Sequence, residues 1–249
     1  VVVYGDTNST LAAAVVAAKM GIPLAHVEAG LRSGNRRMPE EINRIAADRL
    51  STLLFTPTKA AVGHLAAEGL SDGVHVVGDV MLDCVRLYGS DSRYPADVLV
   101  RFGIENRKYA LATIHRAENT DDPVRLAEIF VGLSHAAKVV PIVVPLHPRT
   151  ASVVRGHVLD DVLSGLTITE PAGFLDMMTL EANAGLIVTD SGGVQKEAYF
   201  HGVPCVTIRD ETEWVETVES GWNVLSAGNA ESILANIKTM LDFDRETPR

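Results

Sequence analysis

Short apolar runs alternate with helical patterns along almost the whole sequence, and this alternation constrains the fold more than any other feature. The first runs are Val1–Tyr4 and Leu24–Val27, and a helical pattern follows each. The alternation restarts at Tyr109–Ile114 and continues nearly to the end. Apolar strands that alternate with helices form parallel sheets covered by helices on both faces. The sequence predicts an α/β protein with two Rossmann-like domains and a ligand cleft at the carboxyl ends of the strands.

Domain boundaries are predicted where the alternation breaks. Residues 1–88 are interpreted as the C-terminal part of an N-terminal domain, and the aperiodic residues 89–106 as a linker. Residues 107–228 form the second Rossmann-like domain, and residues 229–249 hold a helix expected to pack back toward the N-terminal domain. Residue 1 is Val and already lies in an apolar run, so we expect an incomplete N-terminal domain. A chain without its first strands is expected to be catalytically inactive or nearly so.

The amino-acid composition restricts the binding partners and the cellular location that can be expected. The sequence is 47% hydrophobic but only 5% aromatic, which predicts an aliphatic core, and its net charge of −10 argues against nucleic acid. Cys84 and Cys205 lie in apolar surroundings and are expected to be buried free thiols in a reducing compartment. No apolar run approaches the ~20 residues of a membrane span. No signal-peptide pattern is present, so the cytoplasm is predicted, without a membrane partner.

The stretch Thr189–Ala198, T-D-S-G-G-V-Q-K-E-A, predicts a phosphate site. An apolar strand, a glycine turn and a helix follow one another, which points backbone N–H groups and the positive end of the helix dipole at an anion. Gly192 and Gly193 have no Cβ atom to block a phosphate from the backbone. Ser191 adds a hydroxyl donor, and Glu197, about one turn into the helix, is placed to accept from a sugar diol.

The alternative is a plain strand–helix connection in which Ser191 acts only as the helix N-cap. For the Ser-Gly-Gly sequence alone this alternative is the better interpretation. Glu197, together with Arg209 at the end of the next apolar run, favours phosphate binding instead.

Polar side chains follow five of the predicted strands. Because the carboxyl ends of parallel strands meet at one edge of a sheet, such side chains build the site in this architecture. Helix capping or a salt bridge would account for each acidic residue alone, but not readily for the whole set. The residues are Asp6, Glu28, His115, Asp190 with Ser191, and Arg209 with Asp210.

Two further patterns bear on the chemistry. Glu40, Asn43 and Arg44 share one face of a predicted helix that begins at Pro39, and this face is either functional or merely exposed and salt-bridged. The eight histidines show no H-x-x-x-H spacing and the two cysteines no C-x-x-C spacing, so no metal site is predicted. His147 follows a strand and is interpreted as structural.

These motifs occur in the order and spacing of one family, over nearly the whole chain to about Gly221. The chain resembles the non-hydrolysing UDP-N-acetylglucosamine 2-epimerases, whose fold resembles that of GT-B glycosyltransferases. H-V-E-A-G-L-R with P-E-E-x-N-R is the most specific part, and T-D-S-G-G is shared more loosely. The matching segments are Gly5-Asp6-Thr7, His26–Arg32, Pro39–Arg44, Thr113–Asn119, His147-Pro148, Glu170-Pro171, Thr189–Ala198 and Arg209–Glu213.

The resemblance implies interconversion of UDP-GlcNAc and UDP-ManNAc. UDP is eliminated to give a 2-acetamidoglucal and is added back after protonation on the other face, without a cofactor or an obligatory metal. Asp6, Glu28, Glu40 and His115 match the family's catalytic positions. The resemblance assigns the three carboxylates to acid–base work around C2, without saying which removes the proton. It assigns His115, together with Arg116, to the diphosphate.

The resemblance also implies a UDP-sugar site in the second domain. It assigns Ser191, Gly192 and Gly193 to phosphate, Glu197 to the ribose diol, and Arg209 to the nucleotide or sugar. The main chain at Ala172 and the side chain of Met177 are expected to line the uracil. A homodimer is expected for the full-length protein. The fragment is expected to bind UDP weakly without epimerising it.

Two departures from the family pattern stand out. Thr212-Glu213 precede Trp214-Val215-Glu216, where most members have R-P-E, which suggests a modified sugar such as a 2,3-diacetamido uronic acid. The family's first strand, with its Gly- and Arg-containing loop, is expected upstream of residue 1. A GT-B glycosyltransferase, a hydrolysing epimerase and a non-catalytic nucleotide-sugar-binding module remain the alternatives.

Overall fold

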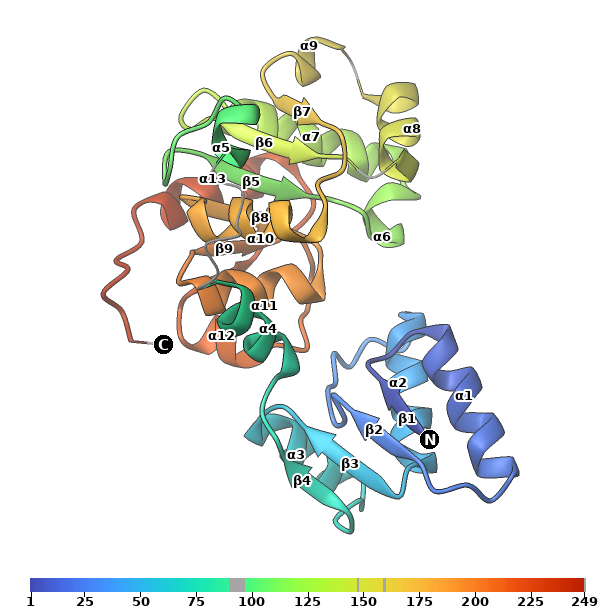
Figure 1. Cartoon of the computed structure of the whole chain (residues 1–249). Coiled ribbons are helices and arrows are strands. Elements are labelled where there is room, and N and C mark those ends of the chain that lie inside the picture. Colours follow the sequence, from blue (N-terminus) through green and yellow to red (C-terminus); the bar gives the residue numbers. More distant parts are fainter. Residues whose placement is uncertain (90–96, 147, 159, 249) are drawn as a thin grey trace. The chain divides into compact units, whose positions relative to one another are not determined.

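The structure, a computed structural model, describes residues 1–89, 97–146, 148–158 and 160–248. Its contacts divide the chain into two compact units (Figure 1). Unit 1 comprises Val1–Asp83 and Glu211–Glu213, and unit 2 comprises Cys84–Asp210 and Trp214–Arg249. Both units are α/β with parallel sheets, so the predicted fold class is confirmed.

Unit 1 contains a four-stranded parallel sheet in the order β1-β2-β3-β4. Its helices begin where the sequence offers caps: Thr7 accepts from the backbone of Thr10 at the start of α1, and Pro39 opens α2. The strands are β1 (Val2–Tyr4), β2 (Ala25–Val27), β3 (Leu53–Thr56) and β4 (Val74–Val76). The helices are α1 (Asn8–Lys19), α2 (Pro39–Leu50) and α3 (Lys59–Ala67).

The first strand is only partly buried. Val3 is 5% exposed, but Val2 is 57% and Tyr4 62% exposed. The physical reason is its place in the sheet, since β1 pairs with β2 alone and lies at an edge.

Unit 2 contains a six-stranded parallel sheet in the order β10-β9-β8-β5-β6-β7. The strands are β5 (Ala110–Thr113), β6 (Ile142–Pro145), β7 (Thr167–Thr169), β8 (Leu186–Thr189), β9 (Cys205–Thr207) and β10 (Asn223–Leu225). The longer helices are α4 (Val80–Gly89), which begins in unit 1, α7 (Pro123–Ala136), α8 (Pro148–His157), α10 (Phe174–Asn183), α11 (Gly192–His201) and α13 (Ala230–Leu241). The shorter helices are α5 (Val98–Arg101), α6 (Ala117–Thr120), α9 (Asp160–Leu163) and α12 (Val215–Glu219).

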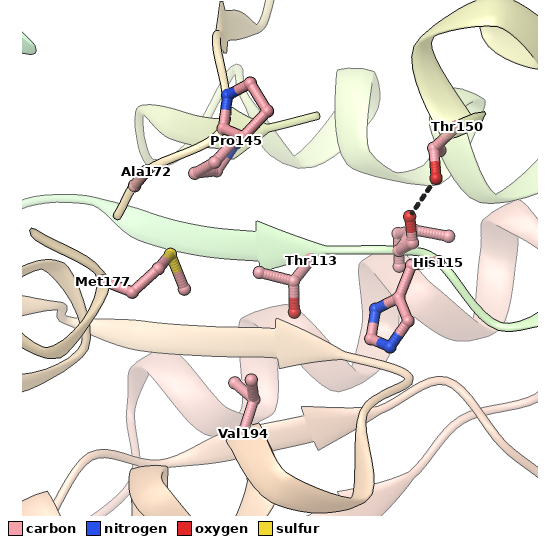
Figure 2. Close-up of a pocket in the computed structure, with 9 residues that line it drawn as sticks. Thr113, His115, Pro145, Thr150, Ala172, Met177 and Val194 are labelled. Atoms are coloured by element: carbon pink, nitrogen blue, oxygen red, sulfur yellow. Dashed lines mark hydrogen bonds between the residues drawn. The ribbon is translucent and has the colours of Figure 1, made fainter. Parts of the chain in front are cut away.

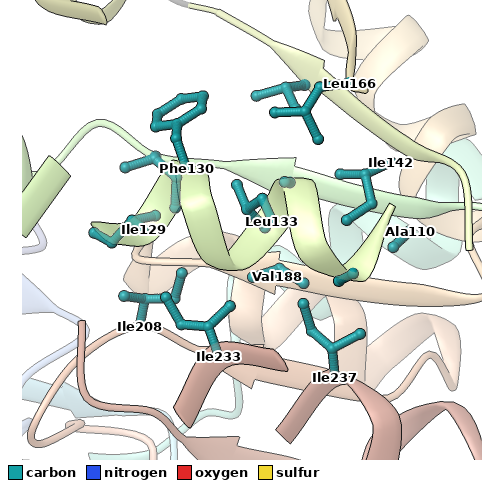
Figure 3. Close-up of a cluster of buried hydrophobic side chains, with 14 of the residues drawn as sticks. Ala110, Ile129, Phe130, Leu133, Ile142, Leu166, Val188, Ile208, Ile233 and Ile237 are labelled. Carbon is teal, nitrogen blue, oxygen red and sulfur yellow. The ribbon is translucent and has the colours of Figure 1, made fainter. Parts of the chain in front are cut away.

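The core of unit 2 is aliphatic and lies where α7 and α13 cover the sheet (Figure 3). Gly132 of α7 permits the close approach of α13, because a Cβ atom there would lie 3.0 Å from Ile233 Cβ and 3.1 Å from the backbone of Ala230. The C-terminal helix was expected to pack toward the N-terminal domain. Within unit 2 it packs against α7, β8 and β9, where Ile233 and Ile237 are fully buried.

The division of the chain also differs from the expected boundaries. It falls between Asp83 and Cys84, before the predicted linker, of which residues 90–96 lie outside the described residues. The reason is that the later part of α4 packs in unit 2: Val85 is buried, and the ring of Tyr88 meets that of Phe174 edge-on, with centroids 5.8 Å apart.

The two cysteines differ in burial. Cys205 is buried, which raises the pKa of its thiol to about 12, whereas Cys84 lies on an exposed face of α4. The prediction of a buried Cys84 is therefore wrong, since its apolar sequence neighbours occupy other faces of the helix. In the described part of the chain, no helix is long and apolar enough to cross a membrane.

Candidate active site

A buried carboxylate organises the loop after β5 in unit 2. Asp190 follows β8, is fully buried, and accepts hydrogen bonds from the backbone N–H groups of His115 (3.0 Å) and Arg116 (2.9 Å). It also accepts from the side-chain amide of Asn119 at 3.0 Å. The His115 side chain is 50% exposed, and its Nδ1 lies 3.3 Å from Asp190. Asp190 therefore fixes the strand end from which His115 projects.

A cavity of about 430 Å³ opens beside this loop. Its walls come from the ends of β5 and β6, from α8 and from the first turns of α10 and α11, and Figure 2 shows Met177, Thr113 and Val194 around one space. Thr150 is held there by a 3.1 Å hydrogen bond to the carbonyl of Ile114. The lining residues are Thr113, Ile114, His115, Pro145, Thr150, Pro171, Ala172, Met177 and Val194.

The structure thus brings three of the predicted residues of unit 2 together: His115, Ala172 and Met177. Pro145, Thr150 and Val194 were not singled out from the sequence. Their only signal is position, because Pro145 ends β6 and Thr150 and Val194 lie in the first turns of α8 and α11. A cavity with apolar walls and a few hydroxyl and imidazole groups suits a flat heterocycle with a polar rim.

The start of α11 shows the geometry expected of the glycine turn. Ser191 is the N-cap and accepts from the N–H of Val194 at 3.4 Å, and Gly192 and Gly193 form the half-buried first turn. The capping alternative is therefore realised, and it leaves the anion-binding geometry of a helix N-terminus intact. Glu197 lies half-buried on the same helix.

The other predicted residues of unit 2 lie outside the cavity lining described above. Arg116 is half-buried at the start of α6. Arg209, after β9, is 1% exposed, so its guanidinium does not reach the surface. Ser191, Gly192, Gly193 and Glu197 also lie outside that lining. His147 lies outside the described residues.

In unit 1 a buried arginine holds the predicted catalytic aspartate. Arg44 of α2 is 1% exposed, and its Nη2 donates a 2.6 Å hydrogen bond to Asp6 Oδ2. The same guanidinium lies 3.4 Å from Glu41 and 3.9 Å from Glu213. Asn43 donates to the backbone carbonyl of Asp6 at 2.8 Å. The interpretation of this helix face as exposed is therefore wrong, because Asn43 and Arg44 point into unit 1.

The structure brings Asp6, Glu28 and Glu40 together. Burial raises the pKa of the Asp6 carboxyl, the Arg44 guanidinium lowers it, and the charges of Glu213, Glu28 and Glu40 raise it further. A carboxyl group such as Asp6, whose pKa responds to burial and to neighbouring charges, suits proton transfer. Sequence reasoning gave no role to Glu213. No group of three or more His, Cys, Asp or Glu side chains among the described residues is arranged to hold a metal ion.

The backbone at this site is strained. Glu28 has a φ of +70°, and Arg107 is the other described non-glycine residue with a positive φ. Such a conformation costs free energy for a residue with a long side chain and persists only where the surroundings hold it. Gly5, with a φ of +59°, accommodates the turned chain, because a Cβ atom there would lie 3.3 Å from the Glu28 carboxylate.

Comparison with known proteins gives concordant results. The family model described as UDP-N-acetylglucosamine 2-epimerase matches residues 1–249. A Methanococcus maripaludis protein named UDP-N-acetylglucosamine 2-epimerase homolog is 48% identical over 95% of this chain and 67% of its own length. The UDP-2,3-diacetamido-2,3-dideoxy-D-glucuronate 2-epimerase of Pseudomonas aeruginosa is 48% identical over 97% of this chain and 67% of its own length.

The fold agrees with a solved structure. The crystal structure of the Methanocaldococcus jannaschii UDP-GlcNAc 2-epimerase in complex with UDP-GlcNAc and UDP matches with a TM-score of 0.88 and 42% identity, over 98% of this chain and 69% of that one. This chain thus spans about two thirds of the relatives it matches. The match covers every motif described above, and the chain belongs to the UDP-N-acetylglucosamine 2-epimerase family.

Proposed function

We propose that this chain carries the active site of a non-hydrolysing UDP-N-acetylglucosamine 2-epimerase, an isomerase that interconverts UDP-GlcNAc and UDP-ManNAc. The observation that carries the proposal is the carboxylate cluster of unit 1 around one buried guanidinium, in a chain of this family. A glycosyltransferase needs no such cluster to transfer a sugar, whereas removal and return of a proton at C2 does.

The carboxylates of unit 1 have distinct environments. Asp6 is ion-paired with Arg44, whereas Glu28 sits on a strained turn and Glu40 on the first turn of α2. We assign acid–base work around C2 to these three residues. Elimination leaves the sugar as a 2-acetamidoglucal, and protonation of that double bond from the opposite face, followed by UDP addition, gives the epimer.

Unit 2 holds the nucleotide in this proposal. The uracil would occupy the cavity lined by Ala172 and Met177, and the diphosphate would approach His115, Arg116 and the N-terminus of α11 at Ser191–Gly193. Glu197 would accept from the ribose diol. Arg209 is assigned to the nucleotide or sugar, and because it is buried this role requires the structure to open around it. No cofactor takes part in this chemistry.

The test is product analysis with UDP-GlcNAc in D₂O. It is run on this chain and on a version extended by the additional segment of the longer relatives. We expect UDP-ManNAc with deuterium at C2 and no acceptor requirement from the extended form, and weak UDP binding without turnover from this chain. Free ManNAc would indicate a hydrolysing enzyme, transfer to an acceptor would indicate a glycosyltransferase, and binding without turnover by both forms would indicate a binding module.

A second candidate substrate is UDP-2,3-diacetamido-2,3-dideoxy-D-glucuronate. The observation that favours it is the 48% identity to the P. aeruginosa enzyme of that name, against 41% and 43% to the M. maripaludis and M. jannaschii proteins named UDP-N-acetylglucosamine 2-epimerase. The M. maripaludis protein named as a homolog of that enzyme is also 48% identical. The W-V-E sequence at Trp214–Glu216 points the same way. Competition between the two UDP-sugars in one reaction distinguishes them, because the better substrate is consumed first.

Location and assembly are also proposals. We propose a cytoplasmic enzyme that forms a homodimer at full length. Sedimentation at several concentrations tests the assembly, and a single monomeric species throughout would contradict it.

A further inference from the structure

A buried ionic network lies beneath the two strand ends that carry Asp6 and Glu28. His26 of β2 is fully buried. Its Nδ1 lies 2.6 Å from the Asp48 carboxylate of α2, and its Nε2 lies 2.7 Å from the backbone carbonyl oxygen of Gly5. Gly5 directly precedes Asp6, and His26 stands two residues before Glu28. One imidazole ring therefore joins the ends of both strands.

Both ring nitrogens of His26 face acceptors. A backbone carbonyl and an ionised carboxylate have no hydrogen to donate, and both distances are short for hydrogen bonds. A neutral imidazole has one N–H and would leave a lone pair pointing at one of the two oxygens. An imidazolium has two N–H groups and satisfies both. The contacts of His26 thus require a doubly protonated ring, unless its partner carries the proton.

The contacts of Asp48 argue against a proton on that carboxyl group. Its Oδ2 accepts from the backbone N–H of Gly30 at 3.1 Å and lies 2.8 Å from Arg32 Nη1. An N–H donor and a guanidinium both stabilise the ionised form. Arg32 is balanced in turn by Glu68, to which it donates from Nε at 2.7 Å and Nη2 at 2.9 Å. Arg49 also lies near Glu68 and donates to its backbone carbonyl.

The network also explains how the strained backbone conformation of Glu28 is maintained. Asp48 binds the side chain of His26 and the backbone of Gly30, which lie two residues before and two residues after Glu28. Gly30 also packs closely against α3, since a Cβ atom there would lie 2.4 Å from the Ala61 carbonyl oxygen. The left-handed conformation of Glu28 is therefore clamped on both sides.

We propose that His26 is a buried imidazolium that, through Gly5 and Asp48, positions Asp6 and Glu28 for proton transfer at C2. It is a positioning residue, since its ring contacts the backbone of the strand ends and no reacting atom. The proposal rests on the proposed function for its chemical consequence. The charge state and the clamp stand on the contacts of unit 1 alone.

The charge state is tested by side-chain ¹⁵N NMR of this chain at a pH above neutral, where exposed histidines are mostly neutral. We expect His26, assigned by its loss in His26→Gln, to show two protonated ring nitrogens, and the exposed His75 to show one. In Asp48→Asn, which lacks the balancing charge, His26 should become neutral. A neutral His26 in the unsubstituted chain would overturn the proposal.

The clamp is tested by amide hydrogen exchange at residues 28–30 of the same variants. Faster exchange there in both His26→Gln and Asp48→Asn is expected, because each loses one arm of the clamp. His75→Gln is the matched control, as an exposed histidine of the same unit, and should exchange like the unsubstituted chain. Unchanged exchange in both clamp variants would overturn the proposal. Neither this test nor the NMR test depends on turnover, so they separate this inference from the proposed function.

The chemical consequence is tested in the form of the protein that turns over. His26→Gln should lower kcat about 10- to 100-fold, the effect of a small displacement of catalytic groups. KM and UDP affinity should stay within about twofold, because the nucleotide is assigned to unit 2. An unchanged kcat, or a loss confined to KM, would contradict the positioning role.

Discussion

The two units bury different kinds of side chain. Unit 2 has an aliphatic core between α7, α13 and the sheet (Figure 3). Its buried charged residues include Asp190 and Arg209 at strand ends and Glu181 and Lys196 on α10 and α11. In unit 1 the apolar clusters are small, and His26, Arg44 and Asp48 are buried beside them. In unit 2, therefore, the cavity opens directly from an apolar core, since Ile114 belongs to the core and also lines the cavity. In unit 1 the residues that stabilise the fold also set the charge of the site.

The largest effect is expected from Arg44→Met. The substitution keeps the apolar stem but leaves Asp6, Glu41 and Glu213 close together without their cation. Breaking a buried ion pair by removing one partner costs about 3–5 kcal/mol. Hydrogen exchange, followed peptide by peptide, should show this loss in unit 1 and not in the α7–α13 core.

Two comparisons sharpen the Arg44 prediction. Arg49→Met, on the exposed end of the same helix, should cost less than about 1 kcal/mol. The Arg44→Met defect should shrink as the pH falls, because protonation of the crowded carboxyl groups removes their repulsion. An equal loss of stability in Arg44→Met and Arg49→Met would show that the stability of unit 1 does not depend on its buried charge. So would an Arg44→Met destabilisation that grows as the pH falls.

Unit 2 should show its own acid sensitivity through His201. Burial lowers the pKa of His201 from 6.5 to about 4, and Nε2 has no hydrogen-bond partner among the described residues. Above pH 6.5 the ring is neutral in both states. Between pH 6.5 and 4, His201 is protonated in the unfolded chain but still neutral in the folded chain. The free energy of unfolding therefore falls by up to about 3 kcal/mol as the pH decreases through this range.

This effect is measured by denaturation at several pH values, followed by tryptophan fluorescence, because both tryptophans belong to unit 2. His201→Gln should lose less stability in this pH range than the unsubstituted chain. His135→Gln, exposed on α7, is the control and should behave like the unsubstituted chain. Identical pH profiles for His201→Gln and the unsubstituted chain would refute the burial argument.

A pair of glycines gives the smallest and most specific comparison. Gly132→Ala should destabilise unit 2 by about 1 kcal/mol, because the new methyl meets the backbone of α13 and this outweighs the gain in helix propensity. Gly63→Ala, on α3 with no atom within 4 Å of the new Cβ, should stabilise unit 1 by up to about 1 kcal/mol. Thermal unfolding measures both, and the same sign of change for both would contradict the packing argument.

The local parts of the fold could be predicted from the sequence. The helix start at Pro39 agrees with the structure, and the apolar runs Val1–Tyr4 and Leu24–Val27 match β1 and β2 to within one residue. A proline at the first helical position and a short apolar run are local signals. The fold class followed from the alternation alone. The short helices Val98–Arg101, Ala117–Thr120 and Asp160–Leu163 were missed, since each is too short to show a period.

Tertiary features of the site could not be predicted. The contact of His26 with Asp48 joins residues 22 positions apart, and Glu213 joins unit 1 from the far end of the chain. Such contacts leave no periodic signal in one sequence. One weak signal was present in the sequence: Asp48 lies one helical turn after Arg44, and this spacing places the two residues on the same face of α2. Exposure was also missed at Cys84, because apolar neighbours in sequence do not say what lies beside a helix.

The central claim is a division of labour, in which unit 1 moves the proton at C2 and unit 2 holds the nucleotide. It is tested by measuring deuterium incorporation at C2 by NMR, and UDP affinity by calorimetry, in Glu28→Gln and Glu197→Ala of the form that turns over. Glu28→Gln should abolish incorporation and leave UDP affinity intact. Glu197→Ala should weaken UDP binding by about 1–3 kcal/mol, the range for a lost charged hydrogen bond. Incorporation at the unsubstituted rate in Glu28→Gln, or unchanged UDP affinity in Glu197→Ala, would contradict the account.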